Sequence, residues 1–333
     1  MRSDCSRLTR RIGLACALAL AGSAPADATD LLVVSGSTNQ VLRFSGATGA
    51  YESVFATIRY PDGLAGDGAG HVYVSTDEGI VAKYDESGDL LDFVLATPGT
   101  GIGDIAVGPD GAVYGTVFFQ DRVVRIDFGA APPTVSDFVP SGSGGLDGPE
   151  GLVFGGPDGE LYVSSRINGE ILLYDHVYGS FLTIYATPGG NGPQRLTFGP
   201  DGDLYVANDG TDTVLRYDPN VQNGFVGTFA TPSAGSSDGM TPAFGPDGNL
   251  YVSLTVFANR VERFDGTTGA SLGTFVAEGS HGLAFASDLV FVPDAGSTPA
   301  GVAAALALAA VRARRGHAGP RVPSDRERKR RPA

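Results

Sequence analysis

The chain contains little cysteine: two of its 333 residues are Cys, and both lie in the first 28 residues. Residues 1–28 show the order of features of a secretory signal, with four arginines, an apolar core from Ile12 to Ala21 and the A-x-A site Ala26-Asp27-Ala28. We therefore expect an exported protein from which residues 1–28 are cleaved. The mature chain would then have no disulfide, no thiol nucleophile and no thiolate metal site.

Basic residues are also scarce: the chain has 23 Lys and Arg but 37 Asp and Glu, which gives a net charge of −14. Four arginines and two aspartates precede residue 29, and nine basic and two acidic residues follow residue 311. The rest of the chain keeps 10 basic and 33 acidic side chains, a net charge near −23. Such a field repels phosphate backbones, so a nucleic-acid partner is excluded. It also favours solubility outside the cell and attracts cations.

Long hydrophobic segments and helical periodicity are missing from the middle of the chain. The apolar run 300–311 has 12 residues, short of the ~20 that span a bilayer. Between the two ends, apolar runs of about three to six residues alternate with Gly, Pro, Asn and Asp, as strands and tight turns do. This pattern predicts an all-β domain.

A repeat organises these short runs. The motif Gly-Pro-Asp-Gly-x-(Leu/Val)-Tyr occurs at 108–114, 156–162, 199–205 and 245–251, after a degenerate copy at 67–73. A period of about 41–48 residues between the tyrosines is the blade period of a β-propeller. Pro-Asp-Gly suits a tight turn. We expect the turn aspartates to be structural and the repeated tyrosines to lie in the core between blades.

Each unit shows four apolar runs, and the ends of the chain decide how many blades there are. Residues 31–34, 40–44 and 53–56 match the second, third and fourth strands of a blade that has no first strand at the N-terminus. Residues 281–285, His-Gly-Leu-Ala-Phe, resemble a first strand. We expect them to complete blade one and close the ring, which leaves no open sheet. The prediction is a six-bladed β-propeller of four-stranded blades over residues 29–291.

The repeat unit, with Gly-Leu-Ala-Phe-x-Pro-Asp-Gly-x-Leu-Tyr-Val followed by Val-x-Arg-Tyr-Asp, resembles the NHL repeat. It is similar to six-bladed relatives of two kinds, the gluconolactonase/regucalcin-like and the virginiamycin B lyase-like propellers. The first kind implies a Glu/Asn/Asp metal site in the channel, and the second implies a channel His with metal-dependent acid–base chemistry. Since one fold hosts many activities, the resemblance speaks for architecture more than for function.

The C-terminal segment, residues 292–333, has a motif of its own. Val292-Pro293-Asp294-Ala295-Gly296-Ser297-Thr298 precedes the apolar run 300–311, and arginines follow directly. This order resembles PEP-CTERM sorting signals, in particular the VPDSG variant. The resemblance implies an exosortase-type processing enzyme, transient membrane anchoring through the apolar run, and delivery to the surface or extracellular matrix of a Gram-negative bacterium. The alternative is a basic tail with an incidental apolar stretch.

Propeller ligands usually bind at the channel mouth, so the residues just before each first strand are the candidate site. These positions are Asp62, Gly103-Asp104, Glu150, Gln194-Arg195, Met240-Thr241 and His281, and neighbouring loops add Asp77, Gln120, Arg166, Asn208 and Asp209. Asp62, Asp104 and Glu150, with Asn208, offer the hard oxygen ligands that suit Ca²⁺. His281 is the candidate general base. Gln194, Arg195, Asn208 and Arg166 are the candidate ligand-binding residues. The alternative is that these side chains cap strands, pair with Arg195 or face solvent.

Three functions remain open on this pattern. The first is an exported scaffold that binds extracellular polysaccharide or a surface protein through its loop-rich faces. The second is a Ca²⁺-dependent hydrolase or lyase, lactonase-like, with its site at the channel mouth. The third is a structural matrix protein without a small ligand.

Overall fold

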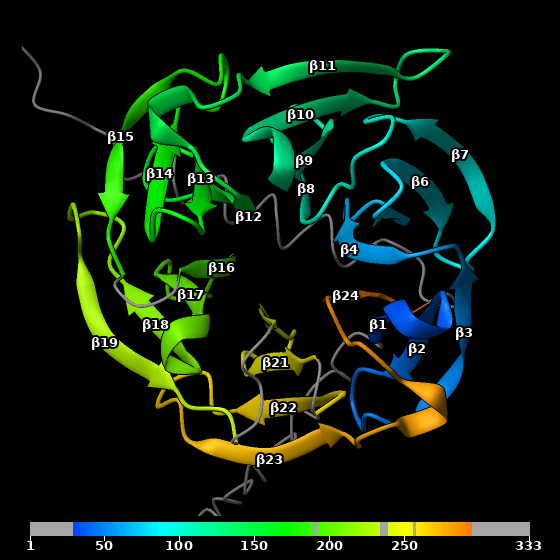
Figure 1. The fold of residues 1–333 in the computed structure, drawn as a ribbon. Helices are drawn as coiled ribbons and strands as arrows, with labels where there is room; N and C mark the ends of the chain where they lie inside the picture. The colour runs from blue at the N-terminus through cyan, green and yellow to red at the C-terminus, as the bar shows by residue number, and fades with distance from the viewer. Residues whose placement is uncertain (1–28, 189–191, 234–238, 256–257, 295–333) are drawn as a thin grey trace, which may run out of the picture.

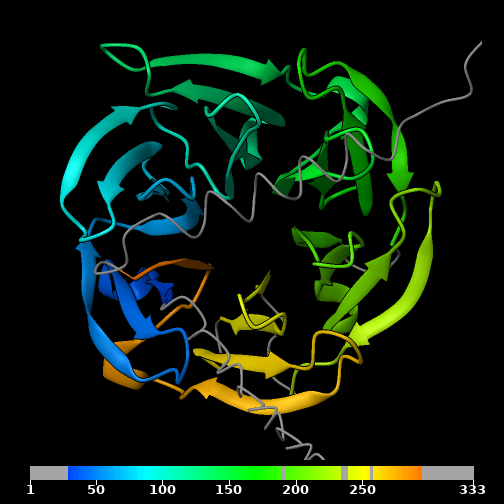
Figure 2. The ribbon, with the colours of Figure 1, turned by 180° about the vertical axis from the view of Figure 1, so that it is seen from behind.

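The computed structural model describes residues 29–188, 192–233, 239–255 and 258–294. These residues form six four-stranded antiparallel sheets arranged as blades around a central axis (Figure 1). The same ring is seen from the opposite side in Figure 2. The six-bladed all-β propeller predicted from the repeat is confirmed. Among the described residues, helix is limited to 3-10 turns, and no helix is long and apolar enough to cross a membrane.

Each blade takes its strands in chain order from the axis outward, with blade one starting on the last strand. Blades one to three are β24 (Leu289–Pro293), β1 (Thr29–Ser35), β2 (Gln40–Ser45), β3 (Tyr51–Thr57); β4 (Pro61–Gly66), β5 (His71–Thr76), β6 (Ile80–Asp85), β7 (Leu90–Leu95); and β8 (Ile105–Val107), β9 (Val113–Val117), β10 (Arg122–Asp127), β11 (Thr134–Val139). Blades four to six are β12 (Pro149–Gly155), β13 (Glu160–Ser165), β14 (Glu170–Tyr174), β15 (Phe181–Ala186); β16 (Pro193–Phe198), β17 (Leu204–Asn208), β18 (Thr213–Tyr217), β19 (Phe225–Ala230); and β20 (Met240–Phe244), β21 (Leu250–Leu254), β22 (Arg260–Phe264), β23 (Ser271–Val276). The 3-10 turns are η1 (Gly36–Thr38), η2 (Phe118–Gln120), η3 (Ser143–Gly145), η4 (Asp209–Thr211) and η5 (Ser280–Gly282).

The repeated tyrosines and turn aspartates stabilise the blades together. Tyr205 is fully buried, and its ring packs edge-on against Phe244 of the next blade, with 4.8 Å between ring centroids. Its hydroxyl donates a hydrogen bond to Asp201 in the preceding turn, which also pairs with Arg216 of β18. Tyr114 and Tyr251 bind their turn aspartates in the same way. The structural role expected for the tyrosines and for these aspartates is therefore confirmed.

Ring closure by the C-terminal end of the chain is confirmed, but the closing strand is not the one expected. β24 pairs antiparallel with β1, from Thr29 opposite Pro293 to Val33 opposite Leu289. Residues 281–285, predicted to be this strand, instead form the turn η5 and the loop after it. They carry the Gly-Leu-Ala-Phe pattern of a first strand, and Leu283 is buried with Leu289 in one core cluster, but β24 supplies the strand pairing with β1.

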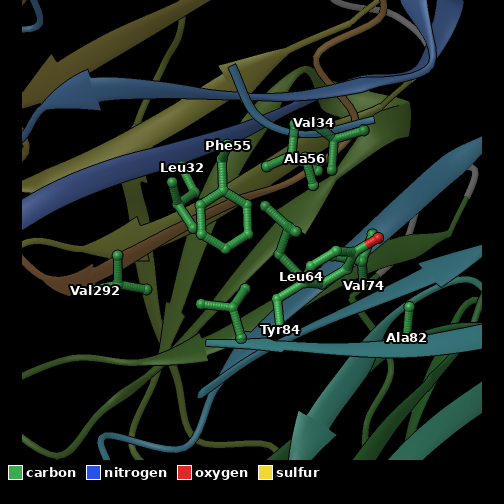
Figure 3. Close-up of a cluster of buried hydrophobic side chains, with 11 residues drawn as sticks. Leu32, Val34, Phe55, Ala56, Leu64, Val74, Ala82, Tyr84 and Val292 are labelled. Atoms are coloured by element: carbon green, nitrogen blue, oxygen red, sulfur yellow. The ribbon is translucent and has the colours of Figure 1, made fainter. Parts of the chain in front are cut away.

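The C-terminal boundary of the propeller also differs from the expectation of residue 291. β24 runs to Pro293, so Val292 and Pro293 belong to blade one. Val292 is buried in the core cluster between blades one and two, near Leu32, Phe55 and Leu64 (Figure 3). The predicted signal at 1–28 and the sorting segment from residue 295 onward lie outside the described residues.

Candidate functional site

Residues in the first turns of the first strands, or just before these strands, meet around the channel, as their positions in the repeat predict. Strand registers align the six first strands on their core residues Leu289, Leu64, Ile105, Leu152, Leu196 and Pro242. The residues one position earlier are Asp288, Gly63, Asp104, Gly151, Arg195 and Thr241, in blade order. One arginine and two aspartates therefore occupy equivalent positions on three different blades.

Arg195 connects these blades through ion pairs. Its guanidinium lies 2.6 Å from the carboxylate of Asp104 and 3.9 Å from that of Asp288. A third contact, of 3.4 Å, joins it to Asp62 of blade two. The Arg195 side chain is only 6% exposed. Because it reaches from blade five to blades one, two and three, this single cation neutralises carboxylates from across the channel.

The two buried aspartates are also bound to the backbone of the next blade. Asp104 accepts a 2.9 Å hydrogen bond from the N–H of Leu152, and Asp288 accepts a 2.7 Å bond from the N–H of Leu64. Gln194 does the same for the N–H of Met240, at 2.9 Å. These side chains thus join adjacent blades near the axis, and their hydrogen-bonding capacity is largely used by the fold.

Burial changes the ionisation of the channel carboxyls. It raises the pKa of Asp288 to about 7, although Arg195 acts in the opposite direction. It also raises the pKa of Asp104 and that of Glu150, again against the influence of Arg195. Burial lowers the pKa of Arg195, but Asp104 and the other carboxylates more than offset this, so the guanidinium stays charged. One cation shared among several acids cannot fully compensate their removal from water.

Above this network, a cavity of about 340 Å³ opens at the channel mouth. Arg195 and Gln194 lie in its wall together with Asp62, Glu150 and Arg166. Met240 and Phe285 add apolar surface to the same wall. Of the residues predicted to bind a ligand, Arg195, Gln194 and Arg166 line this cavity.

A second hollow, of about 300 Å³, shares Asp62 and Glu150 with the first. Asp77 and the aromatic pair Phe118 and Phe119 complete its wall. Burial, with the neighbouring Asp62, raises the pKa of Asp77 to about 6. Phe119 is 85% exposed. The mouth therefore combines carboxylates with exposed aromatic surface.

The predicted calcium ligands do come together, but not in a geometry that fits a metal. Asp62 and Asp104 both face the Arg195 guanidinium, and Glu150 lies 3.6 Å from that of Arg166. Within the described part of the chain, no group of three or more His, Cys, Asp or Glu side chains is arranged to hold a metal ion. The guanidinium groups already lie against the oxygens that a Ca²⁺ ion would need.

Two other predicted site residues lie elsewhere. His281 is in η5, where its ring stacks on Tyr51 of the outer strand β3 with 3.9 Å between centroids. It does not line the mouth cavity. Asn208, at the end of β17, is fully buried and lines a separate hollow beside β18 and β19. Arg166 joins Asp209 at 2.9 Å, next to Asn208 in the chain.

Besides the mouth aromatics Phe118, Phe119 and Phe285, sequence reasoning missed the channel residue Asp288. It precedes Leu289-Val290-Phe291 as Asp104 precedes Ile105-Ala106-Val107, so the pattern Asp followed by three apolar residues was available as a signal. The Gly-Leu-Ala-Phe pattern of residues 281–285 competes with this signal, and the sequence alone does not decide between the two segments.

Comparisons with known proteins add the fold and no more. No family model matches the chain, and no curated protein matches it by sequence. Among solved structures, a chain of a nidogen/laminin complex aligns with a TM-score of 0.63 at 20% identity, covering 80% of this chain and 99% of the other.

Two further structures show the same architecture. A protein of unknown function from Bacteroides caccae has a TM-score of 0.59 at 14% identity, over 80% of this chain and 99% of its own. A streptogramin B lyase has a TM-score of 0.51 at 17% identity, over 77% and 75%. At these identities the similarity establishes a shared propeller fold and leaves the activity to be argued from the site. The chain is thus similar in fold to propellers from a binding complex and from a lyase.

Proposed function

We propose that this chain is an exported propeller that acts at the cell surface or in an extracellular matrix as a binding scaffold, and that its channel mouth receives a cationic amine with an apolar stem. The signal-like residues 1–28, the motif that starts at Val292 and the acidic composition support the location. The excess of carboxyl groups over arginines at the mouth is the observation that supports a cationic ligand.

Among the described residues, the mouth and the network beneath it hold more carboxyl groups than the two arginines there can neutralise. Arg195 is shared among Asp62, Asp104 and Asp288. Arg166 is shared between Glu150 and Asp209. Asp77 adds another carboxyl at the second hollow. A surface of this kind attracts a cation and strengthens its contacts where the walls exclude water.

The walls also suit the carbon chain of an amine. Phe118 and Phe119 form an edge-on pair beside Asp77, with 5.2 Å between ring centroids. An ammonium group next to aromatic faces gains a cation–π attraction of about 0.5–1 kcal/mol at exposed sites. Met240 and Phe285 offer apolar contact in the adjoining cavity. Amine-bearing chains, such as lysine side chains of a surface protein or amino groups of a polysaccharide, have this chemistry.

The metal-dependent hydrolase or lyase is the less supported function. It needs free carboxylate oxygens and a base at the mouth. Asp104 is held by Arg195 and by the N–H of Leu152, and His281 stacks on Tyr51. These contacts leave binding as the activity that the geometry supports best.

The proposal is tested by calorimetric titration of the chain with hexylammonium chloride at fixed ionic strength. We expect a dissociation constant of about 1 mM or lower, which suits a ligand of this size. Removing two mouth charges, in the variant Asp77→Asn/Glu150→Gln, is expected to weaken binding at least about tenfold, or roughly 1.4 kcal/mol.

Two controls separate this result from general effects. Asp137→Asn removes a carboxylate from the outer strand β11 that lines neither mouth hollow, and is expected to leave binding unchanged. Hexanol has the apolar stem without the charge and is expected to bind more weakly than hexylammonium. Equal binding of hexylammonium by the double variant and the unmodified chain would rule out the mouth as the amine site.

A further inference from the structure

A groove between blades four and five differs in chemistry from the channel mouth. It has a volume of about 360 Å³ and lies beside the outer strands β18 and β19 of blade five (Figure 1). Among the described residues that line it, none is charged, whereas carboxylates line both hollows of the mouth. The polar lining of this blade-five groove consists of Thr187, Asn208, Thr211, Thr213, Asn223 and Thr228, with the ring of Tyr217 beside them.

The fold holds both sides of the blade-five groove in place. Leu215 and Tyr217 of β18 belong to one buried core cluster with Tyr185 of blade four. The N–H of Asn223 donates a 2.8 Å hydrogen bond to the carbonyl of Tyr185, and the Tyr185 hydroxyl donates one of 2.8 Å to the carbonyl of Asp218. The loop that leads into β19 is thus attached to blade four. A site that is already formed loses less entropy when a ligand binds.

Blade five has short hydroxyl side chains where blade three has an ion pair. Thr213 lies two residues before Leu215 on β18, and Thr228 lies opposite Leu215 on β19. The residues at the same positions of blade three are Arg122 on β10 and Asp137 on β11, and these two pair with each other. The substitution of two threonines for a long ion pair leaves space on this face of the blade, together with groups that form hydrogen bonds.

The polar groups of the groove match the hydroxyl groups of a neutral sugar. A threonine hydroxyl and an asparagine amide can each donate and accept hydrogen bonds, as a sugar hydroxyl can. The hydroxyls of Thr211 and Thr213 lie 2.6 Å apart and share one hydrogen bond. Because a hydroxyl oxygen has two lone pairs, both oxygens can still accept a hydrogen bond from a ligand. A lining without charge offers no ion pair to a charged ligand, so neutral hydroxyls are the better match.

Phe225 supplies the apolar surface that a sugar ring also needs. Its side chain is 53% exposed, and its ring lies beside that of Tyr217 with 5.4 Å between centroids. The faces of a sugar ring carry C–H groups, and contact with an exposed aromatic ring removes these groups from water. Thr187 and Asn223 are exposed as well, so the groove is open to solvent. A sugar unit within a longer polymer can therefore enter it.

We propose that the blade-five groove binds a sugar unit of a neutral polysaccharide. Its volume lies at the small end of the range of about 300–1,000 Å³ that is usual for small-molecule sites. A few neutral hydrogen bonds and one aromatic contact make a weak site, and we expect a dissociation constant of about 1 mM for a short oligosaccharide. The site is independent of the proposed amine site, because no described residue lines both the groove and a mouth hollow.

Affinity electrophoresis of the full chain tests the proposal, in native gels that contain dextran, a mixed-linkage β-glucan or a galactomannan. We expect at least one of these neutral polysaccharides to slow the migration of the chain, relative to a gel without polysaccharide. The variant Thr213→Arg/Thr228→Asp gives blade five the ion pair of blade three and leaves the net charge unchanged. It is expected to weaken binding at least about tenfold. Phe225→Ser, which removes the aromatic ring without filling the groove, is also expected to weaken binding.

Two further variants serve as controls. Thr274 of β23 has the same position in blade six as Thr228 in blade five, so Thr274→Asp adds a carboxylate outside the groove and is expected to leave binding unchanged. Asp77→Asn/Glu150→Gln changes the mouth alone and is also expected to bind the polysaccharide normally, which separates this test from that of the amine site. The proposal is overturned if none of the three polysaccharides slows the chain, or if Thr213→Arg/Thr228→Asp is slowed as much as the unmodified chain.

Discussion

Truncation after Ser287 is expected to unfold the propeller, whereas truncation after Asp294 leaves it folded. The shorter chain loses β24, including the core residues Leu289 and Val292, which are 3% and 4% exposed. Each large apolar side chain contributes about 1.5–3 kcal/mol by burial. Losing a whole strand therefore approaches the 5–15 kcal/mol that stabilises a typical domain.

The loss also reaches the channel and the sheet of blade one. Removing Asp288 takes away the acceptor for the N–H of Leu64, and removing β24 exposes the backbone of β1. Circular dichroism and limited proteolysis of the two truncated chains measure the difference. Equal melting temperatures would show that β24 does not close the ring. The same geometry limits any C-terminal processing, because a cut before Pro293 removes part of blade one.

Arg195→Met is expected to cost about 3–5 kcal/mol of stability, the usual loss when one partner of a buried ion pair is removed. The substitution keeps an apolar stem of similar length but leaves Asp104 and Asp288, which are 11% and 4% exposed, without their cation. The matched control is Arg122→Met. Its partner Asp137 is 52% exposed, so a loss of about 0–1 kcal/mol is expected.

The stability lost in Arg195→Met is also expected to depend on pH, and to increase as pH rises. The pKa of Asp288 is raised to about 7 in the folded protein, against an ordinary value of 3.8. A carboxyl with a raised pKa holds its proton more tightly when folded. The contribution of this carboxyl to the free energy of unfolding is therefore fully present below its ordinary pKa, and it is lost as pH rises through about 7. Without Arg195, which lowers the pKa of Asp104 and Asp288, the loss becomes larger.

Denaturant unfolding at about pH 5 and pH 8 measures this dependence. The stability difference between Arg195→Met and the unmodified chain is expected to be larger at the higher pH, because charged aspartates are then buried without a partner. The role assigned to Arg195 is contradicted if Arg195→Met and Arg122→Met lose equal stability, or if the difference shrinks as pH rises.

The sequence predicts the architecture well because one motif recurs in several blades and marks the same turn and strand in each of them. The Tyr and Asp of Gly-Pro-Asp-Gly-x-(Leu/Val)-Tyr form a hydrogen bond with each other in blades three, five and six, which gives the motif a structural role. The prediction of the closing strand is wrong because residues 282–284 have the same sequence, Gly-Leu-Ala, as residues 63–65 of the first strand of blade two. β24 has no Pro-Asp-Gly turn after it, so the sequence signal that marks the other first strands is missing there.

The site was predictable in position and not in chemistry. The repeat places Asp62, Asp104, Glu150 and Arg195 around one axis, and the structure brings them together. Whether such carboxylates hold a metal or an arginine depends on how far side chains reach across the channel, which no local pattern encodes. Here Arg195 extends to Asp104 and Asp62, so the alternative of pairing with Arg195 is confirmed for both.

Thermal unfolding with hexylammonium chloride, CaCl₂ or EDTA, at constant ionic strength, tests the central claim most directly. A ligand that binds only the native state stabilises it by RT ln(1 + [L]/Kd), about 2.7 kcal/mol at a hundredfold excess over Kd. We predict a rise in melting temperature with hexylammonium that is lost in Asp77→Asn/Glu150→Gln, and equal melting in Ca²⁺ and EDTA. A rise with Ca²⁺ that EDTA reverses, with no effect of hexylammonium, would contradict the account and identify the mouth as a metal site.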